Sequence, residues 1–567
     1  MKWRWTDVWL AARGGPIVLK HLAASQLKAN LLKLKDGRAS WALGGSKPKA
    51  GTPLPRVEAL HLGHGDVVWI DQTTATHLTL SANSTADGRG MDVTAKGSLR
   101  ALPVDLKAHA DDTFALIQSN GASKDVAVLV DGTVGLSTVR FEGTTGGLSS
   151  EQRLDGMLHL RGDSLASVGD LFGITLPQSP PFDLQARLAH DRGVWQLDAQ
   201  KFVVGGSELG GAFKFDSRVS PPLLSGSLTG SRLRLVDLGP AIGGKGGSAV
   251  AAAAGVGAHR VLPDRKFDLP SLSAMNAHLD VEIAQLDLNT KALAPLSKLQ
   301  AIVDLKDGVL TIGDLRAQAS GGEVSGSMRL EGLGGTAKWA ADLTFRGIDV
   351  ARWLRVGDKT VAKQAPKGTS ALAKTAPVSY LTGELAAKMK VAGSGQSTAD
   401  IIGSLGGQVD AIIKNGTISH LLVEAAGLDL AQGLGILISG DDALPMRCAR
   451  VQLAAKDGLA TVTRGVVDNK DTTLFVSGDL SLRKETFALK AVAKPKDVSL
   501  FTLRSPVHIT GPWSSPAIKL ESGKLAGKAV ASILLGAIAG PAALLPFIDL
   551  GSNETDDPCT GTAKAQR

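Results

Sequence analysis

The sequence predicts a mainly β protein: an elongated, curled, multi-stranded antiparallel sheet with a groove or taco-like form and a few short helices, including an apolar C-terminal helix. Three observations predict this class. Apolar and polar residues alternate with a period of two in many short segments. Pairs of Asn or Asp with Gly recur between these segments. The composition combines 67 Gly with only 4% aromatic residues, so Ala, Leu and Val supply most of the apolar content.

The alternation is clearest over residues 277–288. There Leu279, Val281 and Ile283 stand between polar neighbours, which gives a strand with one apolar and one water-facing side. These three residues are therefore candidates for the lining of a groove or a core. The same pattern recurs at 104–110, 212–215, 327–330, 479–482 and 487–493.

Tight turns are expected where Asn or Asp precedes Gly, because both residues accept the positive φ of short hairpins. The pairs are Asp87-Gly88, Asp131-Gly132, Asp155-Gly156, Asp307-Gly308, Asn415-Gly416 and Asp457-Gly458. An irregular repeat accompanies them, with copies over 191–215, 306–330 and 456–482. Each copy predicts a hairpin strand, a loop and two further strands.

Helical patterns are few, at 164–172, 397–405, 420–438 and 524–538, and Ser397 with Asp400 resembles a capping box. Segments 44–53, 241–258 and 356–378 have linker composition. The predicted organisation is an N-terminal segment over 1–43, β-rich repeat regions over 54–240 and 259–355 separated by a Gly/Ala-rich linker (241–258), a flexible linker (356–378), a C-terminal β region over 379–523, an apolar helix over 524–548 and a flexible tail over 549–567.

The charge balance is 62 Lys and Arg against 54 Asp and Glu, a net charge of +8. The basic residues are scattered, and the sparse cluster Lys519, Lys524 and Lys528 has no interleaved aromatics, so no nucleic-acid partner is predicted. Charges recur throughout the chain, which argues against a polytopic membrane protein. The apolar content argues against a disordered one.

Catalytic motifs are absent from the sequence: there is no nucleophile elbow, phosphate-binding loop, dinucleotide fingerprint or zinc-protease motif. His61 and His64, with Asp66, are the nearest approach to a metal site, but on a strand their spacing sends the two imidazoles to opposite faces. The sequence therefore predicts no catalytic, cofactor-binding or metal-binding residues, and an enzyme is not expected.

The stretch 529–548 contains no charged residue. Val530, Ile533, Leu534 and Ile538 fall on one helical face, and two prolines interrupt the run. This predicts a short apolar helix that caps the sheet or contacts a membrane or a lipid groove, rather than a span of the bilayer.

The C-terminal third resembles the AsmA family of Gram-negative envelope proteins. The similar segments, in order, are Gly403-Ser-Leu-Gly-Gly-Gln-Val-Asp, Asn415-Gly-Thr-Ile-Ser, Glu424-Ala-Ala-Gly-Leu-Asp-Leu, Met446-Arg-Cys-Ala, Pro495-Lys-Asp-Val-Ser-Leu-Phe-Thr-Leu-Arg-Ser-Pro and Pro541-Ala-Ala-Leu-Leu-Pro. Weaker similarity extends upstream to Lys35-Asp-Gly-Arg-Ala-Ser-Trp. In family members that segment lies well inside the first domain, so residues 1–43 look like a remnant without the anchor helix.

The resemblance implies a protein of the periplasm, associated with the inner membrane, whose β-groove binds or conducts lipid acyl chains and supports outer-membrane biogenesis. A phospholipid or other envelope lipid, and outer-membrane assembly proteins, are then the expected partners. The alternative is a structural or assembly factor that regulates protein targeting to the outer membrane through protein partners at exposed sheet edges.

The chain contains two cysteines, Cys448 and Cys559. By count alone they could form a disulfide or remain two free thiols. Both lie in segments that look typical of the AsmA family, and the resemblance therefore favours a disulfide formed in the periplasm.

Overall fold

The computed structural model describes residues 18–19, 22–40, 56–57, 60–112, 125–146, 153–172, 179–242, 273–288, 293–332, 336–354, 381–419, 443–470, 472–496, 506–513, 517–520 and 558–559. Within these residues the protein is mainly β with few helices, as predicted. The chain divides into two compact units. Unit 1 comprises Met1–Ser231 and Ala274–Leu279, and unit 2 comprises Arg232–Ser273 and Asp280–Arg567.

Strands of unit 1 pair with their neighbours in chain order from β4 to β13, and every one of these pairs is antiparallel. β2 departs from the antiparallel expectation, because it pairs with β4 in parallel, as do the short strands β1 and β3. The strands are β1 (Val18–Leu19), β2 (Leu22–Lys33), β3 (Arg56–Val57), β4 (Leu60–Asp71), β5 (Thr76–Ser84), β6 (Met91–Leu99), β7 (Leu102–Ala110), β8 (Val126–Val134), β9 (Ser137–Gly146), β10 (Arg153–Gly162), β11 (Phe182–Asp191), β12 (Val194–Val204) and β13 (Ser207–Asp216).

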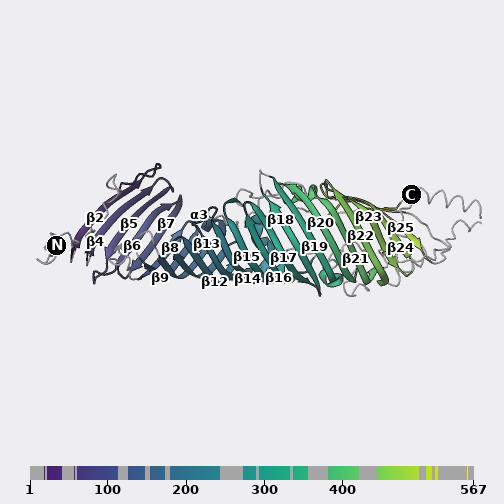
Figure 1. Cartoon of the computed structure of the whole chain (residues 1–567), viewed down its shortest axis with the longest axis horizontal. Coiled ribbons are helices and arrows are strands. Elements are labelled where there is room, and N and C mark those ends of the chain that lie inside the picture. The colour runs from purple at the N-terminus through teal and green to yellow at the C-terminus, as the bar shows by residue number, and fades with distance from the viewer. Residues whose placement is uncertain are drawn as a thin grey trace, which may run out of the picture. The chain divides into compact units, whose positions relative to one another are not determined.

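Strands of unit 2 form the same kind of antiparallel meander from β16 to β27, and Figure 1 shows them side by side in chain order. They are β16 (Leu296–Lys306), β17 (Val309–Ala319), β18 (Gly322–Glu331), β19 (Ala337–Asp349), β20 (Glu384–Gly395), β21 (Gly406–Ser419), β22 (Ala443–Lys456), β23 (Leu459–Asn469), β24 (Thr472–Ser481), β25 (Thr486–Pro495), β26 (Val507–Pro512) and β27 (Ala517–Leu520). The division between the units falls within β14 (Leu223–Arg234) and β15 (Asn276–Asp287).

The strands do not close into a ring. Among the described residues β2 has β4 as its strand partner and β27 has β26. The other edge of β2 carries only a short bridge from Lys33 to Ala39, and the other edge of β27 has no described partner strand. The three predicted repeat copies correspond to β12–β13, β17–β18 and β23–β24, each entered through a tight turn. Each copy therefore holds two strands instead of the predicted three. β19 and β20, which flank residues 356–378, pair directly with each other.

Two predicted helices are present in the described residues, α3 (Leu165–Phe172) and α5 (Thr398–Gly403). The Ser397 hydroxyl accepts a hydrogen bond from the backbone N of Asp400 at 3.1 Å, which confirms the predicted cap. The sequence missed α4 (Val350–Trp353) and the 3-10 helix η1 (Leu235–Ile242). The predicted helices over 420–438 and 524–538 lie outside the described residues.

Half of the predicted Asp/Asn-Gly turns are wrong. Asp131-Gly132, Asp155-Gly156 and Asn415-Gly416 lie inside β8, β10 and β21 instead of between strands, whereas the other three pairs lie between strands. Gly132 uses its positive φ of 149° within a strand. Gly156 allows a close approach to β9, since an added Cβ would lie 2.6 Å from the Cα of Gly143.

Several glycines bend strands without ending them. Gly326 in β18 has φ +147°, and a Cβ built there would lie 2.0 Å from the carbonyl oxygen of Asp342 on β19. Gly407 in β21 has φ +130°, and a Cβ built there would lie 2.2 Å from the carbonyl oxygen of Lys390 on β20. Such glycine kinks curl a sheet, so these positions help to explain the curl. Gly97, Gly132, Gly211, Gly226 and Gly478 share these two features.

The buried residues form several small clusters along the sheet. In unit 1, Val168 of α3 packs against Leu160, Phe182 and Leu184. In unit 2, Ile401 of α5 packs against Ala337, and Trp353 of α4 packs against Ile348. Each of these helices therefore covers apolar strand residues near one part of its own unit.

Candidate functional site

The register of unit 2 places apolar residues in rows that cross the strands. One row crosses eleven consecutive strands, since each of its residues is the direct partner of the next. It comprises Val303, Ile312, Met328, Ala341, Val391, Gly407, Ala455, Ala460, Leu480, Phe487 and Gly511. Since side chains alternate between the faces of a sheet, one face of unit 2 is apolar from β16 to β26.

Unit 1 has an equivalent row that crosses ten strands, β4 to β13. It comprises Val67, Leu80, Ala95, Leu106, Gly132, Val139, Leu160, Leu184, Phe202 and Leu209. We call the side of each unit that carries these rows its apolar face, and the opposite side its polar face. A ligand that contacts an apolar face would meet side chains without formal charge along the whole row.

Large side chains on the apolar faces remain partly exposed. Trp69, the direct partner of Leu78 in unit 1, is 36% exposed, and Val451, the partner of Ala411 in unit 2, is also 36% exposed. Leu343 and Met389, which face each other on β19 and β20, are half-buried. The apolar faces therefore retain apolar surface that a ligand could cover.

The strand residues predicted as groove or core lining lie on β15. Val281 is 8% exposed and Ile283 is 1% exposed, while Leu279 is half-buried. Asp280 and Glu282 between them are exposed. The strand therefore has the predicted alternation, with its apolar side turned away from solvent.

The polar faces carry ladders of charged and hydrogen-bonded pairs. Arg187 on β11 holds Asp155 on β10 through two bonds of 2.9 and 2.8 Å, which lowers the pKa of the carboxyl and raises that of the guanidinium. His109 lies between two carboxylates, with Nδ1 at 2.7 Å from Asp92 and Nε2 at 3.2 Å from Asp111. These pairs join neighbouring strands from the side opposite the apolar rows.

The pKa of His109 is raised above its usual 6.5, first by the hydrogen bond to Asp92. A raised pKa in the folded state stabilises the fold below the unfolded-state pKa, and this contribution is lost as the pH rises through the folded-state value. We expect Asp92→Asn to lower the pKa of His109 in an NMR titration of protein with 13C-labelled histidine. Asp105→Asn, on the same strand as His109, is the control; an equal pKa in parent and Asp92→Asn protein would contradict the assignment.

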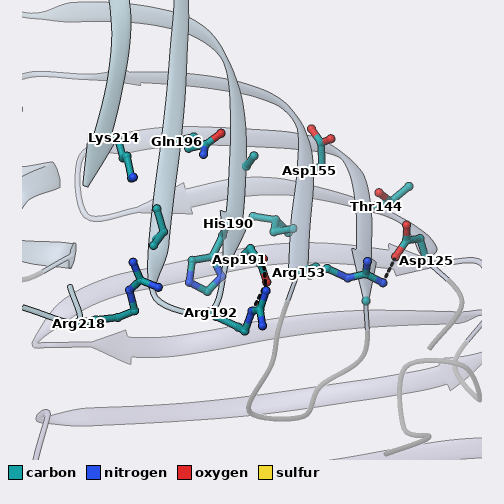
Figure 2. Close-up of a pocket in the computed structure, with 14 residues that line it drawn as sticks. Asp125, Thr144, Arg153, Asp155, His190, Asp191, Arg192, Gln196, Lys214 and Arg218 are labelled. Carbon is teal, nitrogen blue, oxygen red and sulfur yellow. Dashed lines mark hydrogen bonds and ion pairs between the residues drawn. The ribbon is translucent and has the colours of Figure 1, made fainter. Parts of the chain in front are cut away.

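A polar pocket of about 490 Å³ lies at one end of the unit 1 strands (Figure 2). Its floor is a row of direct partners on β9 to β13, namely Thr144, Asp155, Ala189, Gln196 and Lys214. Four of them lie on the polar face because they alternate with the apolar-row residues of their strands. On β12 a register shift between Ala199 and Phe202 puts Gln196 on the polar face too, where it pairs with Ala189 and Lys214. The hairpin ends add Arg153, Asp191, Arg192 and Arg218 to its rim.

Most charged groups at this polar pocket are already paired. Arg153 Nη2 lies 3.2 Å from Asp125, and Arg192 Nε lies 3.4 Å from Asp191, as Figure 2 shows. Arg218 bonds Asp216 at 2.6 Å, and these contacts lower the pKa of Asp216 to about 2. Lys214 has no ion pair within the described part of the chain.

The structure joins Cys448 to Cys559 in a disulfide, with Cα atoms 6.4 Å apart and 111 residues of sequence between them. Cys559 is fully buried against Cys448 and Val466 on the polar face of β22 and β23. Arg450 donates to the carbonyl of Cys559 at 2.8 Å and holds Asp410 through two further bonds, which lowers the pKa of Asp410. The segment at residues 558–559 is thus fixed to unit 2 covalently and by hydrogen bonds.

A buried carboxylate lies beside this disulfide. Asp468 is the direct partner of Cys448, is 1% exposed, and accepts bonds from Arg447, Thr473 and Lys496. Three donors compensate the cost of burying its charge. The network therefore fixes the strand positions that hold Cys448.

Sequence reasoning missed the polar pocket, Arg450 and Asp468, because scattered charges on strands have no spacing that distinguishes a site from a solvated face. The predicted helix face of Val530, Ile533, Leu534 and Ile538 lies outside the described residues. No helix in the described ranges is long and apolar enough to cross a bilayer. The same residues contain no group of three or more potential metal ligands; His64 instead contacts Asn83 and Asp66.

Two comparisons with known proteins show what this sequence is similar to. The profile of the AsmA family matches residues 200–464. The chain is also 26% identical over 466 residues to the AsmA family protein YhjG of Escherichia coli (strain K12), an alignment that covers 78% of this chain and 64% of that protein. The chain thus spans somewhat under two thirds of the length of this curated relative. Together these matches confirm the resemblance to the AsmA family stated above, and the match to the family profile covers residues 200–464.

Proposed function

We propose that this chain is a non-enzymatic cell-envelope protein that binds lipid acyl chains along its apolar faces and conducts them between the inner and outer membranes, in support of outer-membrane biogenesis. The observation that carries the proposal is the pair of uninterrupted apolar rows, one in each unit. Its setting is the periplasm, in association with the inner membrane. The AsmA family match and the bonded cysteines, which suit an oxidising compartment, support this setting.

Acyl chains need little from a site except apolar surface. Each CH₂ group transferred from water contributes about 0.8 kcal/mol, so a chain of ordinary length binds through burial alone. Rows of Leu, Val, Ile and Ala supply this surface, and the half-buried Leu343 and Met389 would lose their remaining water contact beneath a ligand. The rows would let a chain move along the sheet, because successive strands offer similar contacts.

The direct test is mass spectrometry of lipids that copurify with the full chain after gentle extraction from envelopes. The proposal expects lipid in amounts comparable with the protein. A chain that is lipid-free under conditions in which a known lipid-binding protein retains its ligand would contradict the proposal.

A charge placed on the apolar face should remove the lipid without unfolding the sheet. We expect Leu343→Asp to reduce copurified lipid at least several-fold, because a carboxylate would have to be desolvated beneath the acyl chain. The matched control is Thr344→Asp, the next residue on β19, which lies on the polar face. Circular dichroism checks that both variants keep their strands, and equal lipid content in the two variants would place the lipid elsewhere.

The unpaired edges favour a second candidate function, as a factor for protein targeting or assembly at the outer membrane. Among the described residues β27 has a partner on one side only, so a strand of another protein could add to the other side. Crosslinking from a photoreactive residue at Ala517, compared with one at Thr510 on β26, would test this. The assembly candidate requires partner adducts at Ala517, and equal yields at both positions would contradict it.

A further inference from the structure

We propose that the polar pocket of unit 1 binds a hydroxyl-bearing anion with a single negative charge, such as a sugar carboxylate or the phosphodiester of a polyol. The apolar faces would not supply this activity, because the pocket floor lies on the polar face of β9 to β13. The inference is therefore independent of the proposed acyl-chain function.

The residues that line the pocket carry one more positive charge than negative charges. Its lining contains four permanent cations, Arg153, Arg192, Lys214 and Arg218, and three carboxylates, Asp125, Asp155 and Asp191. The lining residues themselves therefore carry a net charge of +1. A ligand with one negative charge would neutralise this excess.

Lys214 is the cation that an anion would meet. The three pocket arginines are each ion-paired, and the pocket carboxylate Asp155 is ion-paired with Arg187. Lys214 makes no such pair within the described residues, although its charge contributes to the lowered pKa of Asp216. Figure 2 shows its side chain beside Gln196 at the pocket. An ammonium group has three donors, so it can hold an anionic oxygen and still bond a neighbouring group.

The remaining groups suit hydroxyls. Thr144 and Gln196 make no side-chain hydrogen bond to other described residues, and each offers both a donor and an acceptor. Asp125 and Asp191 use one or both oxygens in ion pairs but can still accept from hydroxyl groups, because a carboxylate has about four lone-pair positions. Ala189 has a small side chain and Gly146 has none, so the pocket keeps a volume of about 490 Å³ for a ligand. The combination recognises a polar, anionic molecule rather than an apolar one.

The test uses the full chain and two kinds of probe. A soluble arm measures glucuronate against neutral glucose by calorimetry. A vesicle arm measures flotation with phosphatidylglycerol against phosphatidylcholine, since the first headgroup combines a phosphodiester with hydroxyls. The arm that shows binding identifies the source of the anion, a free solute or a lipid headgroup.

The critical variant is Lys214→Gln, with Lys201→Gln as the control. Lys201 is exposed on the neighbouring strand β12 and is not part of the pocket. We expect Lys214→Gln to weaken binding of the anionic probe at least tenfold, while the Lys201→Gln protein binds the probe as the parent does. The amount of lipid copurified on the apolar face should be the same in both variants and the parent. Absence of binding in both arms, equal affinity for the neutral probe, or equal affinity in Lys214→Gln and parent protein would overturn the proposal.

Discussion

Replacement of both cysteines, in Cys448→Ser/Cys559→Ser, is expected to lower the free energy of unfolding of unit 2 by about 4–5 kcal/mol. The disulfide closes a loop with a sequence separation of 111 residues. On the chain-entropy estimate, a loop of roughly 100 residues stabilises the folded state by about 4.7 kcal/mol. Loss of the disulfide would also release the carbonyl of Cys559 from Arg450, and that bond is 2.8 Å long.

Hydrogen exchange followed by mass spectrometry is the appropriate measurement, because a chain with two units need not unfold in one step. Exchange should accelerate in β22 to β26, and peptides of unit 1 provide the internal control. Parent protein treated with a thiol reductant should behave as the double variant does. Unchanged protection of β22 to β26 in both samples would show that the disulfide does not stabilise the sheet.

Gly326→Ala is expected to destabilise unit 2 by roughly 1–3 kcal/mol or more, because the φ of +147° is nearly restricted to glycine. The added Cβ would also lie 2.0 Å from the carbonyl oxygen of Asp342, so β18 and β19 would have to move apart. The local curl of the sheet would change with them.

Gly313→Ala on β17 is the matched control. A Cβ at Gly313 would have no atom within 4 Å, and its φ is not in the positive range. This variant is expected to unfold at the urea concentration of the parent or slightly above it, since alanine restricts the unfolded chain. Equal unfolding of the two variants would show that positive φ at Gly326 is not required by the fold.

Strands could be predicted from the sequence because their signal is local. The side chains of β15 alternate from Ala277 to Ala284, and a similar alternation reappears along parts of β7 and β25. A cap is local too, and Ser397 was therefore recognised. Asp131-Gly132 could not be assigned correctly, because a hairpin and a kink both use positive φ at Gly132. Only the pairing of β8 with both β7 and β9 distinguishes them, and the β7 partners of the dipeptide, Lys107 and Leu106, lie 24 and 26 residues before it.

The site was predictable in part for the same reason. The apolar rows follow from alternation once the strands pair in order, and the residues of β15 were found this way. The polar pocket depends on the register of five strands, which brings Thr144 and Lys214 onto one row although 70 positions separate their numbers. No short-range pattern contains that information. Parallel pairing of β2 with β4 is equally non-local and was not expected.

The bond between Cys448 and Cys559 also determines how tension would pass through the protein. A pull applied at Arg567 would enter the sheet at β22, because the covalent link bypasses the polypeptide between the two cysteines. β22 is flanked by hydrogen-bonded ladders to β21 and β23, so both ladders would share the load. With the disulfide reduced, hydrogen bonds from Arg450 on β22 and Arg464 on β23 would be the described contacts left to resist the same pull at residues 558–559.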